Sequence, residues 1–329
     1  MLNLVNRLFS SPAISVLIPA YNRPDELRLC LDGFARQTAA RKDYEVIVVD
    51  DGSTEDLASV AAPFRYSLNL RYIRRANGGP AAARNQGLQY CRAPYLLLYD
   101  DDLRPYPDLV EHCLDFHCRK PAERDMALLN FGPDPAILGS PFVRWAFLRM
   151  YQFSKTPDIF DWKHFWSGTL TCKKSVFRHG LFDPAYRMLE DTELGLRLSR
   201  RLDLRIHFDP RLTGTYTREI TLSQFCRRQY SIAYFSHCFA RNYRGMVDFG
   251  YPPYNEPEKF MFDETQLSSL ITSSRAIERS CSSKGDPPKV LQMLWLKADV
   301  HVRANGWMTA RDGRPAQAPG TIGPLLEAN

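Results

Sequence analysis

The chain has 329 residues, of which 44% are hydrophobic and 24% are charged, and its formal net charge is +6. Its length allows one large domain with an appendage or two modest domains, and its composition is that of a soluble globular protein with a core. The mild excess of positive charge suits anionic substrates or an anionic membrane surface, but it is too small to indicate nucleic-acid binding.

The cysteine content and the apolar runs indicate a compartment. The eight cysteines show no paired spacing, which fits a reducing cytosol. No run approaches the ~20 apolar residues that span a bilayer, and residues 1–12 form a short lead-in without the apolar core of a signal peptide. We expect a cytoplasmic protein, with peripheral contact at the inner face of the membrane left open.

Apolar strands alternate with amphipathic helices in the first hundred residues. The expected strands are Ile14–Pro19, Tyr44–Asp50, Leu70–Ile73 and Tyr95–Tyr99. Near-continuous apolar strands in such an alternation predict an α/β fold with a mostly parallel sheet covered on both faces.

Two helices are expected between these strands. Asn22 is expected to cap the first, with Asp25 three residues on. One apolar stripe would be formed by Leu27, Cys30, Leu31 and Phe34. The second helix is expected over Ala81–Tyr90, after Asn77-Gly78-Gly79-Pro80.

Polar clusters follow three of the strands. They are Ala20-Tyr21-Asn22, Asp50-Asp51-Gly52-Ser53 and the triplet Asp100-Asp101-Asp102. Ligands of open α/β sheets bind beyond the carboxyl ends of the strands, so we expect the three clusters to converge on one edge. Crowded carboxylates are unfavourable unless a cation binds them, and Mg²⁺ or Mn²⁺ completed by a substrate's phosphates suits such ligands. A solvated acidic turn is the alternative for the triplet.

The rest of the chain changes character twice. Residues 130–167 are rich in aromatic residues, and we expect them to form a loop and a helix. Their aromatic side chains would either line a pocket or belong to the hydrophobic core. They are Trp145, Phe147, Tyr151, Phe153, Trp162, Phe165 and Trp166. A strand over Leu170–Cys172 precedes a helix that begins near Asp191. Residues 221–310 are basic and aromatic and are expected to be mainly helical, and residues 311–329 form a flexible tail.

Several motifs together resemble the family 2 glycosyltransferases of the GT-A fold. They are Ser-Val-Leu-Ile-Pro-Ala-Tyr-Asn (15–22), Glu-Val-Ile-Val-Val-Asp-Asp-Gly-Ser (45–53), Asn-Gly-Gly-Pro-Ala-Ala-Ala-Arg-Asn-Gln-Gly (77–87), the aspartate triplet, Gly-Thr-Leu-Thr (168–171), Gly-Leu-Phe-Asp (180–183) and Glu-Asp-Thr-Glu-Leu-Gly-Leu-Arg (190–197). The resemblance implies a GT-A catalytic domain over residues 13–220, with a nucleotide-binding, Rossmann-like half followed by the helical C-terminal region.

The resemblance implies a donor nucleotide site formed by Pro19, Ala20, Tyr21, Asn22, Asp51, Gly79, Arg84, Asp100 and Asp101. Asp51 would accept a hydrogen bond from the base N–H, although it could belong only to a strand-ending turn. Arg84 would either balance the negative charge of a phosphate or form a structural ion pair. Asp100 and Asp102 match the family's Asp-x-Asp, with Asp102 as the metal ligand.

The resemblance also implies the catalytic groups. Asp191 would be the general base, and an aspartate there could also be a helix N-cap, since the two roles are compatible. Gly168, Thr169 and Glu190 would lie on the sugar and acceptor side. Many relatives carry a further histidine ligand where Gly-Thr-Tyr-Thr (214–217) stands here, so the metal would be held by Asp102, diphosphate and water.

The implied activity is transfer of a sugar from a nucleotide-diphospho sugar, in particular a UDP-sugar, to a hydroxyl group with inversion, assisted by Mg²⁺ or Mn²⁺. A carbohydrate or lipid-linked acceptor in polysaccharide or glycolipid biosynthesis would fit. The alternatives are a sugar-nucleotide pyrophosphorylase, whose glycine-rich N-terminal signature is absent, and a catalytically weak nucleotide-sugar-binding partner subunit. The presence of both Asp102 and Asp191 favours the enzyme.

Overall fold

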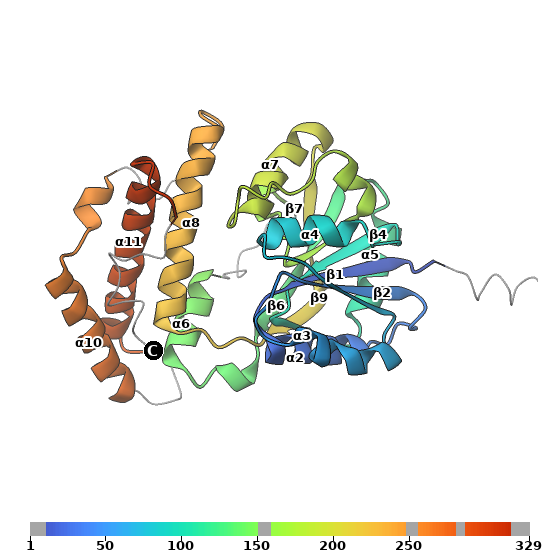
Figure 1. Ribbon diagram of the computed structural model, residues 1–329, viewed down its shortest axis with the longest axis horizontal. Coiled ribbons are helices and arrows are strands. Elements are labelled where there is room, and N and C mark those ends of the chain that lie inside the picture. Colours follow the sequence, from blue (N-terminus) through green and yellow to red (C-terminus); the bar gives the residue numbers. More distant parts are fainter. Residues whose placement is uncertain (1–10, 151–158, 248–255, 281–286, 317–329) are drawn as a thin grey trace, which may run out of the picture. The chain divides into compact units, whose positions relative to one another are not determined.

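The computed structural model describes residues 11–150, 159–247, 256–280 and 287–316 (Figure 1). The chain divides into two compact units: the described parts of Met1–Asp134 with Lys155–Arg218, and those of Pro135–Ser154 with Glu219–Asn329. Most of the expected lead-in and tail, and the aromatic residues Tyr151 and Phe153, lie outside the described residues. The domain limits expected from the sequence stay a prediction.

A single mixed sheet organises the first unit. Nine strands of the described residues form it, with the order β3-β2-β1-β4-β8-β6-β9-β5 and with β7 paired to β9. They are β1 (Ile14–Ala20), β2 (Tyr44–Asp50), β3 (Leu70–Arg74), β4 (Tyr95–Tyr99), β5 (Leu103–Pro105), β6 (Asp125–Pro133), β7 (Ile159–Phe160), β8 (Thr169–Lys173) and β9 (Arg205–Tyr216). The strands expected near the positions of β1–β4 are confirmed.

The sheet has a parallel half and a mixed half. Strands β3, β2, β1 and β4 are all parallel, while β8 runs antiparallel to both β4 and β6. Tyr99 of β4 stands opposite Thr169 of β8. This pairing places the segment before β8 next to the triplet that follows β4.

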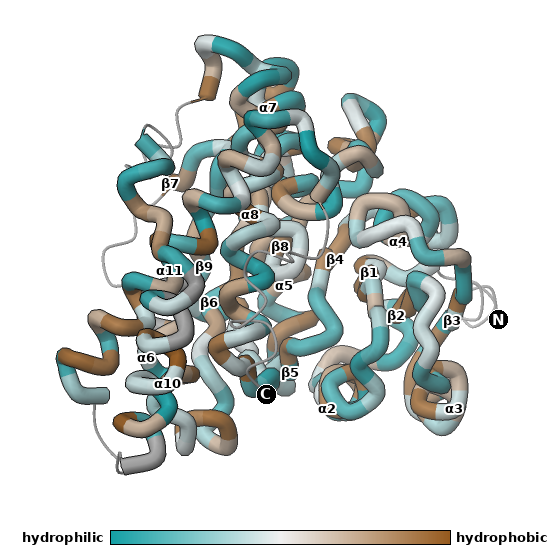
Figure 2. The backbone as a smooth tube through the Cα atoms, turned by 60° about the vertical axis from the view of Figure 1, so that its left-hand side comes forward, coloured by the Kyte–Doolittle hydropathy of each residue, from teal (hydrophilic) through white to brown (hydrophobic). Residues whose placement is uncertain are grey.

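Helices cover both faces of this sheet (Figure 1). The helices of the first unit are α2 (Pro24–Ala35), α3 (Leu57–Ala61), α4 (Pro80–Leu88), α5 (Leu109–Arg119) and α7 (Glu190–Leu202). Helix α4 packs on β1 and β2, and its residues share one core cluster with those of α7. Helix α2 buries the expected stripe on the other face, where Phe34 meets Tyr99 with ring centroids 5.1 Å apart. Hydrophilic and hydrophobic residues alternate along α7, as expected of a helix with one buried side (Figure 2).

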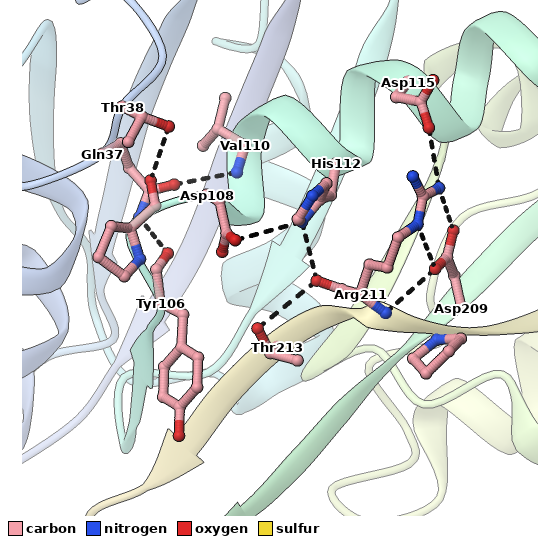
Figure 3. A network of polar contacts seen from close by, with 12 residues as sticks. Gln37, Thr38, Tyr106, Asp108, Val110, His112, Asp115, Asp209, Arg211 and Thr213 are labelled. Carbon is pink, nitrogen blue, oxygen red and sulfur yellow. Dashed lines mark hydrogen bonds and ion pairs between the residues drawn. The ribbon is translucent and has the colours of Figure 1, made fainter.

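A polar network lies among α5, β9 and the segments that follow α2 and β5 (Figure 3). Arg211 of β9 bonds Asp115 of α5 at 2.8 Å and Asp209 at 2.9 Å. His112 donates from Nδ1 to the Arg211 carbonyl oxygen at 3.0 Å. Gln37, after α2, donates to the Tyr106 carbonyl oxygen at 2.7 Å. These bonds connect β9 to α5, and the segment after α2 to the segment after β5.

The second unit is helical. Its helices are α6 (Pro141–Met150), α8 (Leu222–Asn242), α10 (Glu264–Ser280) and α11 (Lys289–Arg311). Phe142 of α6 packs on Trp295 of α11, with ring centroids 5.1 Å apart, and Trp145 packs on the same ring at 5.3 Å. Trp145 is therefore part of a core, which was the plainer of its two expected roles.

Close packing of α8 against α11 depends on Gly306. A Cβ at this position would lie 2.3 Å from the Tyr230 carbonyl oxygen, so only glycine fits. Among the described helices, none has the length and apolar character needed to span a bilayer.

His117, in α5, is a buried neutral histidine. Its Nε2 lies 2.8 Å from Thr171 Oγ1, and the Thr171 hydroxyl donates to the Leu96 carbonyl oxygen. Nε2 must therefore donate, and the unprotonated Nδ1 has no hydrogen-bond partner among the described residues. Burial, with a smaller effect of Lys173, lowers the pKa of His117 to about 3.

This histidine makes stability depend on pH. The folded pKa is below the unfolded value, so the stabilising contribution is complete above pH ~6.5 and is lost as the pH falls toward 3. We expect its contribution to the free energy of unfolding to fall by about 2 kcal/mol between pH 7 and pH 5. Denaturant unfolding of the wild type and His117→Gln at both pH values measures it. Equal losses in the two proteins would contradict the assignment.

Candidate functional site

The loops after β1, β2 and β4 meet at the carboxyl edge of the parallel half of the sheet. The backbone N–H of Asn22 donates to Ser53 Oγ at 2.9 Å, and the N–H of Asp51 donates to the Ala20 carbonyl oxygen at 2.9 Å. Arg23, next to Asn22, bonds to Asp101. The expected convergence of the three polar clusters is confirmed.

Asn22 joins two of these loops instead of capping a helix. Its backbone is left-handed, with φ of 52°, and its Oδ1 accepts a 2.7 Å hydrogen bond from the Thr54 N–H. Helix α2 starts at Pro24, and its N-cap residue, Arg23, makes no side-chain capping bond. The expected Asn22–Asp25 cap was wrong, because the asparagine carboxamide is already bonded to the β2 loop.

Pro19, Ala20 and Tyr21 end β1 at this edge. Pro19 pairs with Val49 of β2, Ala20 is buried, and Tyr21 is 46% exposed. An exposed aromatic ring at the end of a strand can stack on a planar group.

Asp51 accepts hydrogen bonds from its own chain. The Gly79 N–H donates to its Oδ2 at 2.7 Å, the Gly78 N–H to its Oδ1 at 3.0 Å, and Arg75 Nη1 also to Oδ1, at 2.6 Å. Gly79 has φ of 88°, which favours glycine at this position. Asp51 thus shapes the turn before α4, and its expected role toward a base stays a prediction.

Two arginines form ion pairs with the aspartate triplet. Arg23 Nη1 lies 2.7 Å from Asp101 Oδ1 and 3.1 Å from Asp102 Oδ2, and Arg84 Nη2 lies 2.8 Å from Asp100 Oδ1. The other oxygen of Asp101, Oδ2, is buried and has no partner among the described residues. Burial raises the pKa of Asp101 to about 7 although Arg23 opposes the shift.

Arg84 links the triplet to the start of α7. Its Nη1 donates to Glu190 Oε1 at 2.7 Å, and its side chain is almost completely buried. Burial and the neighbouring charge of Asp191 raise the pKa of Glu190 to about 7. Of the two expected roles of Arg84, the ion pair is present. A contact with phosphate stays a prediction.

Asp191 lies in the first turn of α7. The N-cap is Leu189, in a left-handed conformation with φ of 65°, so an N-cap role for Asp191 was wrong. Its Oδ2 instead accepts a 3.1 Å hydrogen bond from the Ser167 N–H. This bond ties the catalytic candidate to the segment before β8.

Gly168 and Thr169 lie between Asp191 and the triplet. The Asp100 N–H donates to the Gly168 carbonyl oxygen at 3.0 Å, and a Cβ at Gly168 would lie 2.1 Å from Asp100 Oδ2. Thr169 Oγ1 is buried without a partner among the described residues. The network thus joins Arg84, Asp100, Gly168, Glu190 and Asp191, whereas the Tyr21 and Thr169 side chains take no part in it among the described residues.

Asp101 and Asp102 suit a divalent cation whose remaining ligands come from a substrate. No group of three or more histidine, cysteine, aspartate or glutamate side chains in the described part of the chain could hold a metal ion. Thr217 belongs to the segment 214–217, where relatives were expected to carry a histidine, and its N–H and hydroxyl donate to the Asp102 carbonyl oxygen at 2.9 and 3.0 Å. Mg²⁺ is commonly held by one or two carboxylates with substrate phosphates, and Asp102 with the orphaned Asp101 Oδ2 suits that mode.

The sequence reasoning missed several residues of this network, among them Arg23, Arg75, Ser167 and Thr217. Arg23 precedes Pro24, a position that disfavours helical backbone, and this signal could have placed Arg23 at the sheet edge. Arg75 and Thr217 carry no comparable local signal, because Asp51 and Asp102 lie far away in the sequence.

Comparisons with known proteins show sequences similar to this chain. Residues 15–168 match the family model described as "Glycosyl transferase family 2". Validoxylamine A glucosyltransferase of Streptomyces hygroscopicus subsp. jinggangensis is 31% identical over 221 residues, covering 57% of this chain and 51% of that protein. Poly(ribitol-phosphate) beta-glucosyltransferase of Bacillus spizizenii is 37% identical over 92 residues, covering 27% and 14%. The chain spans about half the length, or less, of these relatives.

Solved structures share the fold. Residues 1–349 of S. aureus TarS superimpose with a TM-score of 0.55 at 15% identity, over 92% of each chain. The mannosyltransferase PcManGT from Pyrobaculum calidifontis, solved with GDP-Man and Mn²⁺, gives a TM-score of 0.60 at 15% identity, over 93% of this chain and 89% of that one.

The contact of Gly168 with Asp100 predicts that a larger residue at position 168 lowers the stability of the protein. In Gly168→Ala the new Cβ would push the Asp100 carboxylate off Arg84, and we expect the free energy of unfolding to fall by about 1–3 kcal/mol. Denaturant unfolding measures this change. Gly132→Ala is the control, because a Cβ there meets nothing within 4 Å. Equal stability of the two variants would contradict the prediction.

Proposed function

Residues 15–168 of this chain are a family 2 glycosyltransferase domain of the GT-A fold, and from that premise we propose that the protein transfers a sugar from a nucleoside-diphosphate sugar to an acceptor hydroxyl with inversion. The observation that carries the proposal is the continuous polar network from the aspartate triplet to Asp191. It runs through Arg84 and Glu190 on one side and through Gly168 and Ser167 on the other.

The position of Asp191 supports a role as the general base. Its carboxylate is held by the Ser167 N–H and lies on the first turn of α7, next to Glu190. In a single displacement, the acceptor hydroxyl would give its proton to Asp191 while its oxygen forms a bond to the anomeric carbon. The bond from that carbon to the diphosphate oxygen would break, and its electron pair would leave with the nucleoside diphosphate.

The aspartate triplet would act on the leaving group through a bound metal ion. Asp102 would hold Mg²⁺ or Mn²⁺, with Asp101 beside it, and Thr217 would fix the backbone of Asp102. When bound, the ion supplies positive charge that stabilises the departing diphosphate.

We propose a UDP-sugar as donor and a glycan or glycolipid hydroxyl as acceptor. Support comes from relatives named as glucosyltransferases, and from TarS, which has been solved with UDP and with UDP-GlcNAc. PcManGT, solved with GDP-Man, makes GDP the alternative to test.

Nucleotide binding tests the donor side. We expect one of UDP, GDP or dTDP to bind the wild type with Mn²⁺, and binding to be lost in Asp102→Ala, because the ion loses its ligand. Isothermal titration calorimetry with and without Mn²⁺ measures this. Asp25→Asn, which alters a carboxylate that is 86% exposed, is the control and should bind normally. Failure of all three nucleotides to bind the wild type would refute the proposal.

Replacement of the base tests the chemical step. We expect Asp191→Asn to lower kcat by about 10²–10⁴ while the Kd for the nucleotide stays within about twofold, because the amide cannot take a proton. Nucleoside diphosphate release with donor and acceptor reports kcat. Asp203→Asn, at the far end of α7, is the matched control, since asparagine tolerates its left-handed backbone. An unchanged kcat would exclude Asp191 as the base.

A further inference from the structure

Arg23 places a positive charge between two carboxylates of the triplet. A single nitrogen, Nη1, makes both contacts, at 2.7 Å to Asp101 Oδ1 and 3.1 Å to Asp102 Oδ2. The Asp101 side chain is 2% exposed and that of Asp102 10%, whereas the Arg23 side chain is 32% exposed. The guanidinium thus covers two buried carboxylates from the solvent side.

This position overlaps with the one that the proposed function gives to a divalent cation. An ion bound to Asp102 would stand close to the Arg23 guanidinium, and like charges at such a distance repel each other. Arg23 also occupies Asp102 Oδ2, one of the two oxygens that a ligand carboxylate offers. The ion and the guanidinium therefore compete for the same carboxylates.

The side chain of Arg23 can leave without unfolding its loop. The backbone on either side is fixed by the Asn22 bonds to Ser53 and Thr54 and by Pro24 at the start of α2. The guanidinium is not restrained in this way, because its only hydrogen bonds with the described residues are those to Asp101 and Asp102. A guanidinium released at this edge would find phosphate oxygens to be good acceptors, since its planar fork matches them.

We propose that Arg23 is the resident counter-cation of the triplet and that it passes from the carboxylates to the diphosphate when a divalent ion binds. The inference rests on the proposed function. Its consequence is positive coupling between the binding of the ion and the binding of the diphosphate. Without diphosphate, the ion has to displace Arg23 from the carboxylates, and the guanidinium loses its partners. With diphosphate bound, the displaced guanidinium gains phosphate oxygens as new partners. Because such coupling is reciprocal, the ion strengthens diphosphate binding by the same factor.

Binding of Mn²⁺ alone provides the test. Free Mn²⁺ is measured by electron paramagnetic resonance during titration of the wild type, with and without saturating UDP, or the nucleotide that calorimetry selects. In Arg23→Gln we expect Mn²⁺ to bind about tenfold more tightly without nucleotide, and the strengthening by nucleotide to shrink by about tenfold. Arg28→Gln, which removes an exposed arginine of the neighbouring helix, should match the wild type.

A second variant separates the charge from the fold. Arg23→Lys keeps a cation beside the buried Asp101 and should keep weak binding of Mn²⁺ alone, and circular dichroism reports folding of each variant. Unchanged Mn²⁺ affinity and coupling in Arg23→Gln, with the wild type binding both ligands, would overturn the role of Arg23 and leave the proposed function standing. Should Arg23→Gln not fold, equally tight binding of Mn²⁺ alone by Arg23→Lys and Arg23→Gly would overturn it. A wild type that binds neither Mn²⁺ nor any nucleotide would overturn both.

Discussion

The site depends on burying more carboxyl groups than cations at one edge of the sheet. Arg84 bridges Asp100 and Glu190, and Arg23 bridges Asp101 and Asp102. Each guanidinium therefore serves two carboxyl groups, and the edge keeps an excess of negative charge. Loss of either arginine would leave a buried carboxylate without a partner, which is costly because the interior solvates charge poorly. A ligand that brings positive charge relieves the same excess.

The change of strand direction next to β4 assembles the two halves of the site. The parallel strands deliver the loops that carry Asn22, Asp51 and the triplet. Antiparallel β8 then places Gly168 against Asp100, so that Ser167 reaches Asp191 at the start of α7. A fully parallel sheet would put the beginning of β8 at the opposite edge, because parallel strands all end on the same side. The triplet and Asp191 thus come together through this one reversal.

Residues that can serve either in a helix cap or in a contact between loops show the limit of sequence reasoning. Asn22 and Asp191 both stand where a helix cap is expected, yet Asn22 bonds Thr54 and Asp191 bonds Ser167. A carboxamide or carboxylate serves equally well in a cap and in a loop contact. The choice is made by a donor that is 32 residues away for Asn22 and 24 for Asp191, and no local pattern contains that information.

The sequence by itself determined the strands β1, β2 and β4, the buried stripe of α2 and the convergence of three polar loops. These features follow from periodicity and from the shared direction of parallel strands, which act over a few residues or by a general rule. Only the tertiary structure decided which cation meets which carboxylate. Arg23 meets Asp101 across 78 residues, and Arg84 meets Glu190 across 106. Such pairs are selected by burial and packing of the whole unit, because a carboxylate withdrawn from water binds whichever guanidinium the fold brings within reach.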